Sequence, residues 1–135
     1  MEMFAEYSHA IASLGIWAIL ISVLSGYSTV GRSAENRCDC GKPKRDYSDP
    51  AYRRERAFMN AVEWAGPFIA ATVAGILIGA NPFMVNLFAS IFVVARIAMA
   101  VVHTATENQP MRSLFFAVGF FCVLGQAILA VATAL

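Results

Sequence analysis

Four apolar stretches, each about as long as a membrane crossing, limit most strongly what this chain can fold into. They run over about 8–30, 57–79, 82–103 and 112–135. A helix needs ~20 mostly apolar residues to cross the hydrocarbon core, and helices satisfy their backbone polar groups internally. Only 14% of the 135 residues are charged, against about one quarter in soluble domains. We predict an all-α membrane protein, a four-transmembrane-helix bundle forming a single domain over residues 1–135.

The distribution of cations predicts the orientation of the bundle. Seven of the ten Lys and Arg residues lie between Arg32 and Arg54. Loops rich in Lys and Arg stay in the cytoplasm. We therefore expect the 32–55 loop to be cytoplasmic and both termini to lie outside the cytoplasm. The loop has too few apolar residues to form a core, so we interpret it as a solvated connector with helical ends.

Small residues indicate where the second stretch packs. Ala71, Gly75 and Gly79 recur every four residues, a spacing that lets helix backbones approach closely in membranes. We therefore place this helix centrally. The alternative is the ordinary frequency of Gly and Ala in membrane helices.

The three cysteines give little indication of metal or redox chemistry. Cys38 and Cys40 form a Cys-Asp-Cys string without a second ligand pair, which is a weak metal signal. We expect two reduced thiols in the loop, a packing role for Cys122, and no metal centre.

Several ionisable side chains lie within or at the ends of the apolar stretches. Arg56, Asn60 and Glu63 are spaced to share one helix face. Arg96 lies about as far inside the third stretch as Glu63 lies inside the second, since seven residues span roughly 10 Å of helix. We therefore expect Glu63 and Arg96 to pair, because a buried pair costs less than either charge alone.

Such a pair leaves positive charge at the cytoplasmic end. Arg56 and Arg112 remain unpaired there, with His103 and Ser113 nearby in the sequence. Arginine binds carboxylates by two-point contacts and stays charged, so the cluster predicts a site for a small anionic ligand. Taken singly, the Glu63–Arg96 pair could be an interhelical staple, and Arg112 an interfacial anchor.

The string Arg56-Ala57-Phe58-Met59-Asn60-Ala61-Val62-Glu63 resembles the signature of the membrane-associated proteins of eicosanoid and glutathione metabolism, the MAPEG family. Asn81-Pro82-Phe83 is similar to the turn after that family's second helix. Arg96 followed by Pro110-Met111-Arg112-Ser113 is similar to the segment that joins its third and fourth helices. The resemblance covers roughly residues 49–135, and the combination is more specific than any single part.

The resemblance implies a four-helix protomer in a homotrimer, with glutathione as co-substrate between protomers near the cytoplasmic face. By position, Arg56, Asn60 and Glu63 match residues that hold glutathione, and Arg96 matches an arginine of the same cleft. Arg112 matches the arginine that stabilises the glutathione thiolate. The remaining expected contacts are Ser113 beside it, His103, and, as a looser match, Arg32 at the end of the first helix.

The implied function is that of a glutathione-dependent membrane transferase or peroxidase acting on lipophilic electrophiles or hydroperoxides. His103 stands where eicosanoid-forming members carry a tyrosine, and Met99 where the prostaglandin-forming member carries a histidine, which argues against an eicosanoid substrate. We expect a bacterial-type member in the inner membrane, in contact with lipid and without a nucleic-acid partner.

Two other functions stay open at this point. The chain could be a non-catalytic subunit that packs in a larger membrane complex or holds a lipid, with the polar cluster as a structural network. A drug–proton exchanger using Glu63 is less favoured, because such a carrier needs an unpaired carboxylate and Arg96 is available at the same depth.

Overall fold

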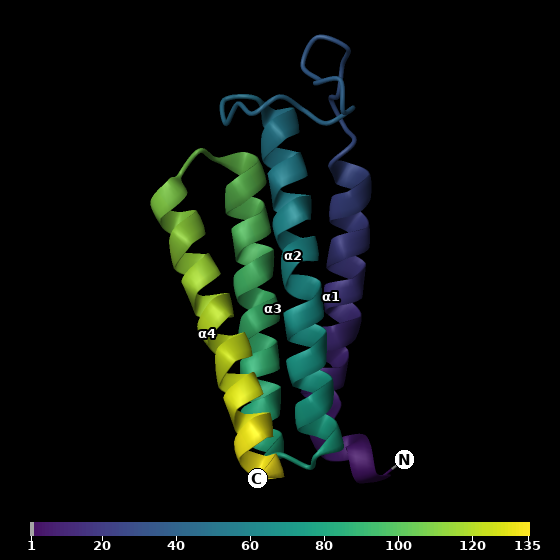
Figure 1. Ribbon diagram of the computed structural model, residues 1–135, viewed down its shortest axis with the longest axis vertical. Coiled ribbons are helices and arrows are strands. Elements are labelled where there is room, and N and C mark those ends of the chain that lie inside the picture. The colour runs from purple at the N-terminus through teal and green to yellow at the C-terminus, as the bar shows by residue number, and fades with distance from the viewer. Residues whose placement is uncertain (1) are drawn as a thin grey trace.

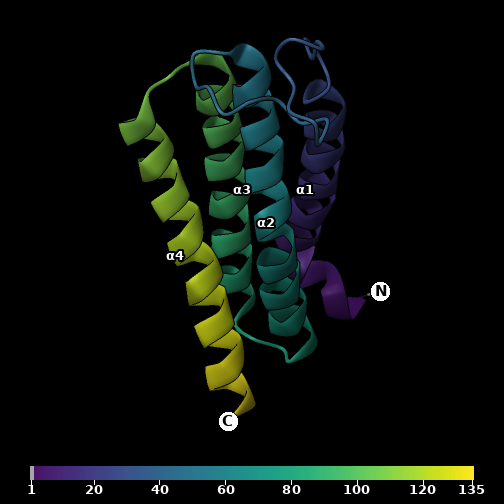
Figure 2. The same ribbon diagram turned by 45° about the horizontal axis from the view of Figure 1, so that its top comes forward.

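The computed structural model describes residues 2–135 as a bundle of four long helices preceded by a short 3-10 helix (Figure 1). The elements are η1 (Glu2–Tyr7), α1 (Ser8–Tyr27), α2 (Pro50–Leu77), α3 (Pro82–Ala105) and α4 (Gln109–Ala134). All four α-helices are long and apolar enough to cross a membrane. The predicted fold class is therefore confirmed. Both termini lie at one end of the bundle, and the α1–α2 loop covers the other end (Figures 1 and 2).

Capping residues shift two helix boundaries from those predicted. Helix α2 begins at Pro50 rather than near 57, because Asp49 accepts a hydrogen bond from the Ala51 N–H at 2.8 Å and proline suits the first turn. Helix α4 begins at Gln109 rather than near 112, since Asn108 caps it in the same way. The charged first turns of α2 therefore extend the helix beyond the apolar stretch.

Helix α3 packs against each of the other three long helices, with α1 and α4 on opposite sides of the α2–α3 pair (Figure 1). An aromatic cluster fills the space between α1, α2 and α3. Trp17, Phe68 and Phe92 are all buried, and the Phe68 and Phe92 rings stack with centroids 4.1 Å apart. This cluster fixes α3 against its neighbours just below the charged residues.

Of the three small residues predicted to pack α2 closely against a neighbouring helix, two lie at such a contact and the third does not. Ala71 and Gly75 are buried, and a Cβ on Gly75 would meet Val85 of α3 at 3.3 Å, so the two backbones approach closely there. Gly79 lies beyond the helix end with φ +71°, a conformation that favours glycine. Its role is to end α2 rather than to pack it.

The loop contains a small hairpin that the sequence did not predict. Arg37 pairs with Pro43 in an antiparallel bridge, and the Cys38 N–H donates to the Lys42 carbonyl at 2.9 Å. Cys38 and Cys40 form a disulfide at its tip, so the expectation of two reduced thiols is wrong for this structure. Two cysteines separated by one residue come together here because the hairpin backbone turns between them.

Candidate functional site

A groove lies between α3, α4 and the loop at the loop end of the bundle, where α4 leans away from α3 (Figure 2). A smaller cavity lies next to it, between α1, α2 and α3. The groove has a volume of about 510 Å³ and is lined by Arg45, Tyr47, Met99, Gln109, Arg112, Ser113 and Phe116. The cavity, about 10 Å³, is lined in part by Trp17, Asn60, Arg96 and His103. Met99 lines both, so it separates the groove from the cavity.

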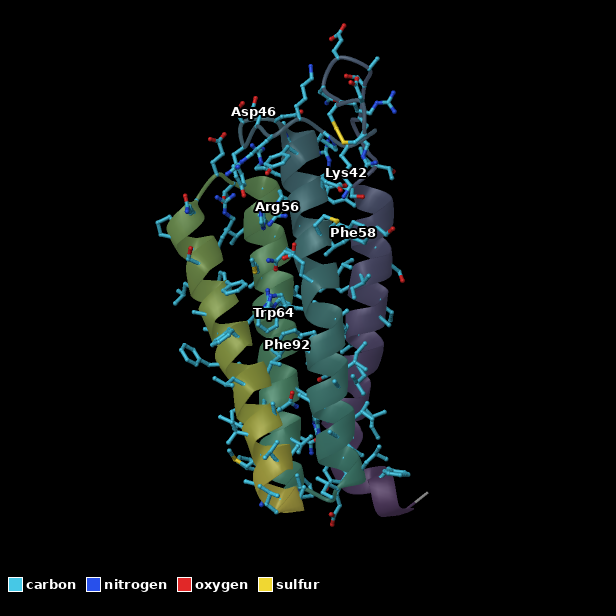
Figure 3. The ribbon with its side chains drawn as sticks, in the orientation of Figure 1. Lys42, Asp46, Arg56, Phe58, Trp64 and Phe92 are labelled. Atoms are coloured by element: carbon cyan, nitrogen blue, oxygen red, sulfur yellow. A yellow bond between two sulfur atoms is a disulfide. The ribbon has the colours of Figure 1, made fainter. Side chains whose placement is uncertain are left out.

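Arg96 is the central cation of this region. It is only 3% exposed, and its Nη1 donates to the Asn60 side-chain oxygen at 2.7 Å. Its guanidinium lies over three aromatic rings, with the carbon 4.8 Å from the Trp64 ring centre and slightly farther from Phe92 and Phe116. Trp64 lies below Arg56, and Phe92 lies below Trp64, in the view of Figure 3. Cation–π contacts of this kind partly offset the cost of burying the charge.

The predicted Glu63–Arg96 pair does not form within the protomer. Glu63 instead contacts Arg56 at 3.8 Å, and its side chain is 51% exposed. The depth estimate was sound, because Arg96 lies beside Asn60 and Trp64. The rotation was wrong. Trp64 faces α3 and α4, where it contacts Arg96 and Phe116, and at about 100° per residue Glu63 points well away from it. Among the described residues, no carboxylate forms an ion pair with Arg96.

Arg112 lies at the wall of the groove and is 9% exposed. Its guanidinium carbon is 4.4 Å from the centre of the Tyr47 ring, a cation–π contact between α4 and the loop. The same tyrosine ring is roughly parallel to the His103 ring, with centroids 6.2 Å apart. Tyr47 therefore connects Arg112 and His103, and sequence reasoning missed it because it lies in the loop rather than in a span.

Arg53 holds that loop in place. Its Nη1 donates to the Tyr47 carbonyl at 2.7 Å and to the Ser48 carbonyl at 3.1 Å. On the other side it contacts the Thr104 carbonyl and, at 3.5 Å, the Glu107 carboxylate. One side chain of α2 thus joins the loop to the α3–α4 link. The sequence did contain a signal for this role, because Arg53 is a cation one turn after the Asp49–Pro50 helix cap.

A second set of charges lies between the end of α1 and the start of α2. Glu55 is 5% exposed and pairs with Arg32 and, at 3.7 Å, with Lys42. Arg32 also donates to the Ser28 carbonyl at 2.9 Å. Arg32 is therefore engaged with Glu55, a buried carboxylate that sequence reasoning did not single out. Glu55 was passed over because it was assigned to the solvated loop.

The predicted site residues thus fall into four groups within the protomer. Ser113 lines the groove with Arg112, and His103 reaches them through Tyr47. Asn60 and Arg96 form the second group, and His103 lines the small cavity beside them. Arg56 and Glu63 form the third group, and Arg32 with Glu55 the fourth.

Several buried nitrogen atoms at this end lack a hydrogen-bond partner among the described residues. They are Nε and Nη2 of Arg96, Nη1 of Arg112, both ring nitrogens of His103, and Nε1 of Trp17. Buried polar groups normally have partners, and each exception needs an explanation. Two buried guanidinium groups with donors to spare suit a ligand that carries carboxylates.

These features define an integral membrane protein with a cationic cleft at one end of a four-helix bundle. A family model described as the MAPEG family matches residues 7–132. The chain therefore belongs to the MAPEG family, as its motifs indicated. No match was found among curated proteins.

Proposed function

We propose that this protein is a glutathione-dependent membrane transferase or peroxidase for lipophilic electrophiles or hydroperoxides. The observation that carries the proposal is the pair of buried arginines, Arg96 and Arg112, whose guanidinium groups have unpaired donors and no carboxylate partner among residues 2–135. Buried charges are normally paired. Glutathione would supply the missing anions, and membership of the MAPEG family supports glutathione as the ligand.

The expected roles follow from where each side chain lies. Arg96, held by Asn60 and the aromatic rings, would bind a carboxylate of the tripeptide. Arg56 and Glu63, at the outer edge of α2, would hold its charged ends. Arg112 borders the open groove, where the thiol would lie.

Arg112 would act by stabilising the glutathione thiolate, because a nearby cation favours the ionised form of a thiol. The thiolate is the nucleophile. In the transferase reaction its sulfur forms a bond to an electrophilic carbon, and the leaving group departs with its electron pair. In the peroxidase reaction the sulfur attacks the terminal peroxide oxygen. The lipid alcohol then leaves, and a second glutathione converts the sulfenic acid to glutathione disulfide and water.

A neighbouring protomer is proposed to complete the site. Glu63 is half-exposed on the outside of α2, at a depth where contact with lipid would be costly. A second copy of the chain packed on this face would cover it, which agrees with the homotrimer that the family resemblance implies. We further propose that the loop end faces the cytoplasm of a bacterial inner membrane, as the cation distribution predicts.

Calorimetric titration of glutathione into the purified protein in detergent tests the proposal. We expect saturable binding at millimolar glutathione or below. Replacement of Arg96 by glutamine should weaken binding by about tenfold or more, since a charge-assisted contact is lost. An absence of binding to the wild-type protein would refute the enzymatic function, and the non-catalytic packing subunit would take its place.

A further inference from the structure

The function proposed for the cleft gives no role to the disulfide between Cys38 and Cys40. It lies at the tip of the loop hairpin, on the side of the loop near α1 (Figure 3). The two cysteines are only two positions apart in the sequence. A disulfide stabilises a protein mainly by closing a loop of the unfolded chain, and the stabilisation becomes smaller as the closed loop becomes shorter. A bond that closes so short a loop contributes little as a staple.

The disulfide is accessible, and the hairpin that carries it is held by other bonds. Cys40 is exposed and Cys38 is partly buried. The Cys38 N–H donates to the Lys42 carbonyl, and the Gly41 N–H donates to the Cys38 carbonyl, both at 2.9 Å. Because these bonds do not involve sulfur, they would keep the two cysteines together after reduction. The reduced pair would therefore be poised to form the disulfide again.

The charge around the disulfide suits an anionic thiol. Between positions 37 and 45 there are four cations, Arg37, Lys42, Lys44 and Arg45, and one carboxylate, Asp39. Lys42 is paired with Glu55, and the other three cations still leave this segment with a net positive charge. Cations attract an anionic reactant and stabilise the thiolate that leaves when a disulfide is attacked. Glutathione carries a net negative charge and a thiol. If the loop faces the cytoplasm, a disulfide there belongs to the class that is transient and chemically active.

We infer that Cys38 and Cys40 form a thiol–disulfide exchange site that equilibrates with glutathione and glutathione disulfide. A glutathione thiolate attacks the exposed Cys40 sulfur. The S–S bond breaks, and the electron pair stays on Cys38 as a thiolate. A second glutathione thiolate then attacks the glutathionyl sulfur, which releases glutathione disulfide and leaves Cys40 as a thiolate. Protons lost by the two glutathione molecules end on the two cysteines, so the step balances and runs in both directions.

Mass spectrometry of the full-length protein in glutathione redox buffers tests this inference. Raising the ratio of glutathione to glutathione disulfide should convert the disulfide to the dithiol, and adding glutathione disulfide should reverse the change. Buried Cys122 should stay unmodified throughout. In Cys38→Ser, Cys40 should accumulate one glutathionyl group when glutathione disulfide is added. In Cys40→Ser, the less exposed Cys38 should do so several-fold more slowly.

Two controls separate exchange at the hairpin from events in the cleft. The first control compares anionic glutathione with cationic cysteamine, with each reduction rate normalised to the rate at which the same thiol reduces a free disulfide. At low salt the normalised rate should be higher for glutathione, and high salt should remove that difference. The double variant Cys38→Ser/Cys40→Ser should keep wild-type glutathione binding in the cleft. A disulfide that persists at the highest glutathione ratio, or a large fall in thermal stability on reduction, would overturn the inference in favour of a structural bond. Equal rates of glutathionylation in Cys38→Ser and Cys40→Ser would overturn the assignment of Cys40 as the sulfur that glutathione attacks.

Discussion

Arg96 shows how a single residue can shape a membrane site without an ion pair. Charged side chains inside the membrane are expensive and face protein or a polar cavity. Arg96 is accommodated by three aromatic rings, the Asn60 amide and a glycine on the neighbouring helix. A Cβ on Gly119 of α4 would lie 2.9 Å from Nε of Arg96. The glycine therefore leaves the space that the guanidinium occupies.

Replacement of Gly119 by alanine should displace the Arg96 guanidinium while leaving the fold intact, because the end of a long side chain can shift. We expect glutathione affinity to fall by about tenfold, which corresponds to about 1.4 kcal/mol, in calorimetric titration. Gly66→Ala is the matched control, since a Cβ there meets nothing within 4 Å. Equal affinities for the two variants would show that the position of Arg96 does not matter for binding.

Glu55 should contribute more to stability than an exposed carboxylate does. Its side chain is 7% exposed and pairs with Arg32. Replacing Glu55 by glutamine leaves Arg32 without its partner. Breaking a buried pair typically costs 3–5 kcal/mol, but Arg32 is 24% exposed, so we expect a loss of about 2 kcal/mol after solvent screening. Thermal unfolding in detergent measures the change.

The control for that measurement is Glu107→Gln. Glu107 pairs with Arg53, but its side chain is 63% exposed, and exposed pairs contribute about 0–1 kcal/mol. A Glu107 variant that unfolds at a lower temperature than the Glu55 variant would contradict the assignment of Glu55 as a buried anchor.

At the scale of elements, the loop end is built by segments that the sequence places far apart. The loop brings Tyr47 against Arg112 of α4 and His103 of α3, while Arg53 of α2 ties the loop to the α3–α4 link. The groove therefore depends on how the loop docks.

Replacement of Arg53 by lysine should loosen that docking, because a single ammonium cannot reproduce the contacts of the planar guanidinium. Hydrogen bonds to charged groups contribute about 1.5–3 kcal/mol, so we expect the unfolding temperature to fall by several degrees. Arg37→Lys is the control, since Arg37 is exposed and its side chain donates, within residues 2–135, to the Ser33 carbonyl alone. Similar unfolding temperatures for the two variants would count against the anchoring role.

The sequence was sufficient to predict the four helices, because length and apolar character decide membrane spans. It was also sufficient to predict that charged residues gather at one end. It did not predict the start of α2, since the Asp49–Pro50 cap was outweighed by the charges that follow. The partner of Glu63 was also missed, because helix rotation depends on packing, and Trp64 rather than Glu63 faces α3 and α4.

At the scale of the whole molecule, we expect several copies of the protomer to assemble. Lipid can cover apolar side chains, but it covers the half-exposed Glu63 poorly. We expect native mass spectrometry in mild detergent to give three copies per complex. Glu63→Leu should disrupt that complex if the face contacts a second copy of the chain. The variant should have no such effect if the face contacts only lipid. A stable monomer, or one copy within a larger complex, would contradict the trimer.

The cleft is proposed to bind glutathione, and Arg112 to stabilise the glutathione thiolate. A thiolate absorbs in the ultraviolet, so difference spectra recorded as glutathione is added to the protein test the claim directly. The wild-type protein should show the thiolate signal at neutral pH. Arg112→Ala should lose that signal while binding glutathione only modestly more weakly, whereas Arg56→Ala and Glu63→Ala should weaken binding first. A thiolate signal that persists in Arg112→Ala, or no signal in the wild-type protein at saturating glutathione, would contradict the account.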